Sequence, residues 1–316
     1  MRSPSLLRMR RVIGATGRGL VTAGLLILLF VAYQLWGTNI LEARAQDNLR
    51  RDFEGQLGSE PQTSSTSDDD PTVSTTTTTT TAPPPAPLPA VGEPVAIIRI
   101  PKIGIDKVVV EGTTTADLRK GPGHYGGTPL PGQIGNAAIA GHRTTYGAPF
   151  ADLDQLLPGD LIQVETLSGI FDYVVSADGV FVVNPDQTDV LDQPSPAQGE
   201  APAATLTLTT CNPKYSARQR LIVKAEYDVR ANQPQPQAPP PQTRTVVSID
   251  AGLSGEHTSR VPTVLWGLIV AGVGLLWWLV FHRYRRWTTW FLGAIPFVVV
   301  LFVFYFFLER ILPSNY

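Results

Sequence analysis

The sequence contains very little cysteine and few charged residues. One of its 316 residues is cysteine, which excludes an internal disulfide and cysteine-based zinc-finger spacings. Charged residues make up 16% of the chain, against about 25% in an ordinary soluble domain. The net charge is −2, so no basic field attracts the phosphate backbone of a nucleic acid. These deficits exclude nucleic-acid binding and complete disorder as descriptions of the whole chain, and they favour a membrane protein.

The first 41 residues lack acidic side chains altogether. An apolar run from Leu20 to Trp36 is long enough for a transmembrane helix, which we expect over residues 20–38. Residues 1–19 should remain in the cytoplasm because they carry only basic charges, at Arg2, Arg8, Arg10, Arg11 and Arg18. A cleaved signal peptide is the alternative, with Ala43-Arg44-Ala45 as the cleavage site. The apolar run exceeds the usual signal-peptide length and ends well before that site, which favours an uncleaved anchor.

Two further apolar runs lie near the end of the chain and predict a helical hairpin. Residues 261–281 and 290–308 have no charged side chain, and each matches a membrane span. The basic turn between them, residues 282–289, should be cytoplasmic, followed beyond the second helix by a tail over 309–316. Both ends of the chain therefore predict a multi-pass cell-membrane protein whose central region is extracytoplasmic. A buried soluble hairpin is the alternative, but such helices show a polar stripe and these do not.

Two polar segments of low complexity bracket a central domain. Residues 39–93 predict an extracellular linker that begins with a helical stretch at Glu42–Phe53 and continues as a Thr- and Pro-rich spacer. Residues 231–260 form a second linker, rich in Gln and Pro. The intervening residues, 94–230, have the length of a single domain.

This central domain is rich in short β-type runs. Turn signals such as Pro158-Gly159-Asp160 and Asp178-Gly179 separate several of them. Short helices are expected at Ala116–Lys120 and Phe150–Leu156. The pattern predicts an all-β barrel or sandwich. The expected strands are Val95–Ile100, Val108–Glu111, Leu161–Glu165, Phe171–Ser176, Val180–Val183, Thr205–Thr210 and Leu221–Tyr227.

The single cysteine lies where one of these strands ends. If the strand before Cys211 and the strand that begins at Arg220 pair as a hairpin, the two residues lie about 5 Å apart across the ladder. A guanidinium beside a thiol lowers the pKa of the thiol and can stabilise an oxyanion. The domain has two histidines, His124 and His142, and His142 also follows a β-type run. Cysteine, histidine and arginine at strand ends predict a nucleophilic site at one rim.

Taken singly, these residues have plainer explanations. A lone cysteine is most often a small buried hydrophobic residue, a lone histidine is more often structural, and Arg220 alone is an ordinary strand-edge charge. An extracytoplasmic position weakens the first explanation, because an unpaired thiol there is exposed to oxidation.

The motifs around these residues resemble those of sortases. Thr207-Leu208-Thr209-Thr210-Cys211 matches the family's Thr-Leu-x-Thr-Cys motif, and Arg220 opens the strand that follows it. Ala140-Gly141-His142-Arg143 is similar to the segment that carries the sortase histidine, and Ile100-Pro101-Lys102-Ile103-Gly104-Ile105 to the first-strand signature. Gly121-Pro122-Gly123-His124-Tyr125 and the residues after His142 look most like class E, the housekeeping-type sortases of actinobacteria. The C-terminal helix pair departs from the usual single-anchor layout of that class, and no Asp-Pro lid typical of pilin-polymerising sortases precedes the domain.

The resemblance implies a closed eight-stranded β-barrel with short helices, in addition to the three expected transmembrane helices. It implies cysteine transpeptidation without cofactor or metal, in which Cys211, His142 and Arg220 are catalytic. Tyr125 and Thr210 are implied to bind substrate. The implied partners are surface proteins with a C-terminal sorting signal of the LPXTG kind, here expected to be LAXTG, and an amine of a peptidoglycan precursor. Two alternatives stay open, a membrane-tethered binding or stalk protein with an inert β-domain and a cysteine hydrolase.

Overall fold

The structure is a computed structural model that describes residues 4–58, 89–193, 203–230, 260–281 and 287–309. The Thr- and Pro-rich spacer, most of the Gln- and Pro-rich linker, most of the basic turn and the C-terminal tail lie outside the described residues.

The central domain is a closed eight-stranded β-barrel, as expected, and the sandwich alternative is wrong. The strands follow one another around the barrel in the order β1-β2-β3-β4-β7-β8-β6-β5. Their bounds are Pro94–Ile100 (β1), Ile105–Glu111 (β2), Gly123–His124 (β3), Gly135–Ala140 (β4), Leu161–Thr166 (β5), Gly169–Val183 (β6), Ala204–Asn212 (β7) and Gln219–Tyr227 (β8). Most pairs are antiparallel, but β2 with β3 and β4 with β7 are parallel.

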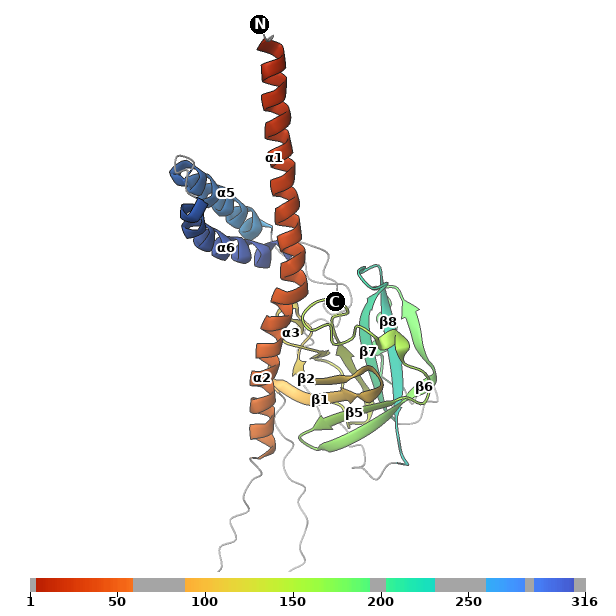
Figure 1. Ribbon diagram of the computed structural model, residues 1–316. Helices are drawn as coiled ribbons and strands as arrows, with labels where there is room; N and C mark the ends of the chain where they lie inside the picture. The colour runs from red at the N-terminus through yellow and green to blue at the C-terminus, as the bar shows by residue number, and fades with distance from the viewer. Residues whose placement is uncertain (1–3, 59–88, 194–202, 231–259, 282–286, 310–316) are drawn as a thin grey trace, which may run out of the picture.

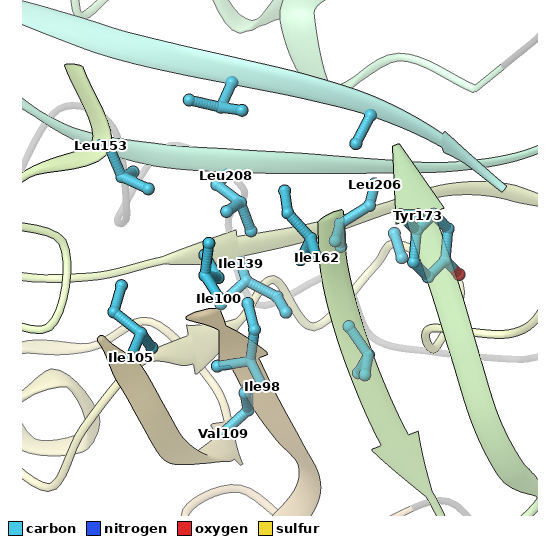
Figure 2. Close-up of a cluster of buried hydrophobic side chains, with 14 of the residues drawn as sticks. Ile98, Ile100, Ile105, Val109, Ile139, Leu153, Ile162, Tyr173, Leu206 and Leu208 are labelled. Carbon is cyan, nitrogen blue, oxygen red and sulfur yellow. The ribbon is translucent and has the colours of Figure 1, made fainter. Parts of the chain in front are cut away.

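The barrel interior is filled by branched aliphatic side chains from almost every strand. Ile98 and Ile100 of β1 meet Ile139 of β4 and Leu206 and Leu208 of β7 in one buried cluster (Figure 2). Strand residues alternate between the two faces of a sheet, so the apolar alternation in β7 directs its leucines inward. This packed core fixes the positions of the strand ends at the rim.

Two sequence expectations about local structure differ from the structure. Asp178-Gly179 was expected to be a turn between two strands, but β6 runs through it and shifts its register against β8 between Val175 and Val180. A Cβ at Gly179 would clash with the carbonyl oxygen of Lys224, so glycine permits this close approach of the two backbones. The second expected helix, at Phe150–Leu156, is only a 3-10 turn over Leu153–Gln155 (η3). The first is a short α-helix over Thr115–Leu118 (α3).

A long N-terminal helix extends alongside the barrel. It consists of α1 (Pro4–Ala32), a π-helical turn η1 (Tyr33–Gly37) and α2 (Thr38–Leu57), and Figure 1 shows the barrel beside α2, far from the N-terminus. The helical expectation for Glu42–Phe53 is confirmed.

The structure adds that α2 is docked on the barrel. Its Leu49 and Phe53 pack on Ile97, Val108 and Val110. The Gln46 side-chain amide accepts a hydrogen bond from the Val108 N–H at 2.8 Å and donates to the Val108 carbonyl at 3.0 Å. On this side of β2, β3 pairs only with Val110 and Glu111. The Gln46 amide therefore satisfies the Val108 N–H and carbonyl groups in place of a neighbouring strand.

The C-terminal helices α5 (Val261–Phe281) and α6 (Trp287–Glu309) form the expected hairpin. Trp266 stacks on Phe307, and Trp277 contacts Phe297, so the helices run antiparallel. Among the described residues, one helix, Val261–Val280, is long and apolar enough to cross a membrane, and Gly19–Ala32 and Ala294–Leu308 are shorter apolar stretches. The hairpin extends to one side of α1, at an angle to it (Figure 1), and contacts it through a hydrogen bond from the Tyr305 hydroxyl to the Leu26 carbonyl at 2.7 Å.

Candidate active site

Three adjacent strands bring His142, Cys211 and Arg220 to one level of the barrel. In the parallel pair, Ala140 of β4 lies opposite Thr209 of β7, and the Gly141 N–H donates to the Thr209 carbonyl at 3.1 Å. His142 and Cys211 each lie two residues beyond that pair. On the other side of β7, Cys211 lies directly opposite Arg220 of β8, which confirms the register predicted from the hairpin.

The Arg220 guanidinium is held against the cysteine sulfur. Its Nη1 lies 3.6 Å from Sγ of Cys211 and also donates to the carbonyls of Ala217 at 3.2 Å and Gln219 at 3.1 Å. The arginine side chain is buried, although long cations are seldom buried without specific partners. The loop between β7 and β8 therefore fixes a positive charge beside the thiol.

The thiol itself is deeply buried, and this reverses the expected direction of its pKa shift. Cys211 is 1% exposed and lies in an apolar cluster with Leu118, Tyr125 and Ile222. Burial raises the pKa of Cys211 to about 11, and the positive charges of Arg220 and Arg143 only partly oppose this. The guanidinium lowers the pKa as expected, but the removal of the thiolate from water has the larger effect. With this pKa, Cys211 is a neutral thiol at neutral pH.

His142 is buried at the start of the loop that follows β4. Its ring stacks on Tyr146, with ring centroids 5.3 Å apart and an interplanar angle of 30°. The other histidine of the domain, His124, is held elsewhere. Its Nδ1 lies 2.7 Å from a carboxylate oxygen of Glu111 and its Nε2 lies 2.9 Å from the Pro129 carbonyl. These bonds engage both nitrogens of His124, so His142 is the histidine available to the site.

The two residues expected to bind substrate both lie beside the cysteine, and their hydroxyl groups have partners within the protein. The Thr210 hydroxyl donates to the Gly141 carbonyl at 2.8 Å, which ties β7 to the segment before His142. The Tyr125 hydroxyl lies 2.9 Å from the Thr209 hydroxyl. Burial raises the pKa of Tyr125 to about 12, so the phenol is neutral. Their roles toward substrate remain predictions.

Arg143 is a site residue for which the sequence predicted no role. It is 3% exposed, and its Nη1 donates to the Cys211 carbonyl at 3.0 Å and to Oδ1 of Asn212 at 2.8 Å. Its Nη2 pairs with Asp154 at 2.9 Å. The sequence shows that Arg143 adjoins His142, but it does not show that this side chain fixes the backbone of the cysteine on another strand.

No group of three or more His, Cys, Asp or Glu side chains that could hold a metal occurs among the described residues. The site consists of a buried thiol, a histidine and a guanidinium at the rim of a closed barrel. It is the arrangement of a cysteine-nucleophile enzyme.

The comparisons identify the family of this domain. The family model described as "Sortase domain" matches residues 98–228, and this part of the chain belongs to the sortase family, whose members are cysteine transpeptidases. Sortase SrtE1 of Streptomyces coelicolor is 35% identical over 218 residues, which cover 66% of this chain and 55% of that protein. Sortase D of Bacillus subtilis is 32% identical over 125 residues, 40% of this chain and 58% of that protein.

The chain therefore spans little more than half the length of these two curated relatives. Among solved structures, sortase E from Streptomyces avermitilis is 40% identical, with a TM-score of 0.40, and the match covers 46% of this chain and 97% of that one.

Proposed function

We propose that this protein is a membrane-anchored sortase that cleaves a C-terminal sorting signal between Thr and Gly and joins the new carboxyl end to an amine of a peptidoglycan precursor. The proposal rests mainly on one observation: His142, two residues beyond the end of β4, lies at the level of the cross-strand pair that Cys211 of β7 forms with Arg220 of β8. The sortase domain supplies the class of reaction.

In the first step the Cys211 sulfur attacks the Thr carbonyl carbon. The thiol proton passes to His142, so the attacking group is a thiolate beside an imidazolium. Because burial raises the pKa of Cys211 to about 11, this charged pair is a minority species at neutral pH. Negative charge develops on the carbonyl oxygen, and the fixed Arg220 guanidinium stabilises it.

The remaining steps return the enzyme to its starting state. The C–N bond of the Thr–Gly peptide breaks, the glycine amine leaves with the proton from His142, and a thioester on Cys211 remains. The incoming amine then attacks the thioester carbonyl and loses a proton to His142. The new amide forms, the S–C bond breaks, and the proton returns to the sulfur. No oxidant, reductant or metal takes part in this sequence.

Tyr125 is proposed to favour a signal of the Leu-Ala-x-Thr-Gly kind. Its hydroxyl lies 2.9 Å from the Thr209 hydroxyl and has two lone pairs, so when it is the donor in that bond it can still accept an N–H from the residue after Leu. Alanine has that N–H and proline does not. We propose that Thr210 contributes indirectly, because its bond to the Gly141 carbonyl sets the distance between β7 and the His142 segment.

The proposed location is the cell membrane, with the barrel on the extracytoplasmic side. The helix Val261–Val280 supports one membrane crossing, and the basic N-terminus and turn support the orientation. Because α2 continues directly from α1, the barrel lies at the end of the helix opposite the N-terminal arginines (Figure 1). Spans over 20–38 and 290–308 complete the proposed topology. They require α1 and the hairpin to lie closer to parallel than they do here, since spanning helices are tilted by about 20° on average.

The experiment that tests the proposal uses the full chain in detergent micelles. A Leu-Ala-x-Thr-Gly peptide with an internal fluorophore pair is incubated with and without an excess of a glycine-like amine, and products are separated by mass. We expect an amide product with the amine and no turnover by Cys211→Ala. A binding or stalk protein would cleave nothing, and a hydrolase would release the free acid at a rate that the amine leaves unchanged.

A further inference from the structure

The loop that follows His142 has an unusual backbone. Tyr146, Gly147 and Ala148 have consecutive positive φ angles of 50°, 72° and 41°. The Phe150 N–H donates to the His142 carbonyl at 3.0 Å and closes the loop onto the histidine. Non-glycine residues rarely adopt left-handed backbone, and they keep it only where the surrounding structure imposes it. The contacts that impose it here come partly from outside the barrel.

Helix α2 supplies two of those contacts. The Tyr146 N–H donates to the Thr38 hydroxyl oxygen at 3.3 Å, and the Gly147 N–H donates to Oδ1 of Asn39 at 2.9 Å. Thr38 is fully buried, and its hydroxyl proton is directed to the Gln34 carbonyl at 2.7 Å, which leaves its lone pairs for the loop. The first turn of α2 thus caps two amides that lie more than 100 positions later in the sequence.

Helix α2 also approaches the loop closely on another side, one turn further along. A Cβ at Gly147 would lie 2.5 Å from a carboxylate oxygen of Glu42, so only glycine fits between them without displacement. Glu42 is itself fixed by Lys107 of β2 at 2.7 Å. The loop is therefore held between the helix and the barrel.

Tyr146 transmits the position of this loop to the histidine. Its ring is buried and stacks on His142 at 5.3 Å, and the Arg119 guanidinium lies 5.5 Å from its ring centroid. A displacement of the Tyr146 backbone would therefore change the surface against which the imidazole packs. A catalytic histidine must hold its orientation closely, because small misplacements reduce the rate strongly.

We propose that helix α2 is part of the active site, and that it orients His142 by holding the backbone of Tyr146 through Thr38 and that of Gly147 through Asn39. Tyr146, Thr38 and Asn39 are positioning residues and do not touch the reacting atoms. The inference rests on the proposed function for the role of His142. It implies that the segment joining the membrane anchor to the barrel sets the turnover rate as well as the location of the enzyme.

The test uses the full chain in micelles and pairs each disruptive variant with a conservative one. Asn39→Leu and Thr38→Val remove the acceptor oxygens at similar volume, whereas Asn39→Asp and Thr38→Ser keep them. Arg50→Ala is the matched control, because Arg50 also ties α2 to the barrel, at Asp106 (2.7 Å), but does not contact the loop. Three quantities are measured: kcat and KM for the sorting-signal peptide, and the NMR signal of the His142 ring, assigned with His142→Gln.

We expect Asn39→Leu and Thr38→Val to lower kcat by about threefold to tenfold with little change in KM, the loss expected for one hydrogen bond. The His142 signal should shift in the same variants, and both kcat and the His142 signal should be restored in Asn39→Asp and Thr38→Ser. Wild-type kcat and an unmoved His142 signal in the disruptive variants would overturn the inference, as would an equal loss in Arg50→Ala. A wild-type chain without turnover would instead refute the proposed function, and the His142 signal would still test the helix contact.

Discussion

The alkylation rate of Cys211 gives a direct test of its environment. The pKa of this thiol is raised from 9.0 to about 11, because burial outweighs the charges of Arg220 and Arg143. Two pKa units correspond to about a hundredfold smaller thiolate fraction at neutral pH, and the thiolate is the form that iodoacetamide attacks. Because the chain has one cysteine, the incorporated mass reports a single site.

We expect the rate on the full chain to rise about tenfold per pH unit from pH 7 to 9.5 without a plateau. A short cysteine peptide, measured in parallel, should level off near its own pKa of about 8.5. Restricted access to the buried sulfur would slow labelling equally at every pH and would not move the plateau. Arg220→Gln removes the larger favourable charge, so its labelling at pH 7 should be slower than that of the wild type. A plateau near pH 8 or 9 in the wild type, or faster labelling of Arg220→Gln, would refute the reasoning.

Three further predictions concern the charge, the specificity and the topology. Arg220→Lys should lower kcat/KM for the sorting-signal peptide by about a hundredfold, because an ammonium group lacks the planar, multiple-donor geometry of the guanidinium. Full activity of Arg220→Lys would refute the proposal that Arg220 stabilises the oxyanion. The wild type should have a higher kcat/KM for a peptide with Ala after Leu than for the same peptide with Pro, and Tyr125→Phe should reduce this preference. An unchanged preference in Tyr125→Phe would mean that the shape of the groove, and not the Tyr125 hydroxyl, selects Ala. A reporter enzyme that is active only outside the cytoplasm should be active when fused after residue 240 and inactive when fused within the turn at 283–286. The opposite pattern would reverse the proposed orientation.

Much of the fold was predictable because it follows from local sequence patterns, such as β-type runs separated by turn residues. The register between Cys211 and Arg220 follows from a hairpin with apolar strands on both sides of one loop, and the structure has that register. The two-residue strand β3 was missed because Gly123 and His124 are too few for a periodic pattern. The prediction of a turn at Asp178-Gly179 was wrong, because β-bulges and turns favour the same residue types.

The support around the site was less predictable, because it depends on contacts between distant segments. The sequence does not show that the Gln46 amide binds the Val108 backbone or that Arg143 binds the Cys211 carbonyl. It also does not show that the Tyr146 ring stacks on His142. The pKa of Cys211 was expected to fall because the neighbouring guanidinium was visible in the pattern, whereas the depth of burial was not. Single residues and short hairpins were thus predictable, but packing across the barrel was not.

The most direct test of the central claim is the intact mass of the full chain during turnover. After brief exposure to a Leu-Ala-x-Thr-Gly peptide without an amine acceptor, the wild type should gain the mass of the peptide up to Thr, minus water. That mass should be absent from Cys211→Ala and should disappear when an amine is added, with the matching amide appearing in solution. Cleavage by the wild type without any such adduct, or cleavage by Cys211→Ala, would contradict covalent transpeptidation through Cys211.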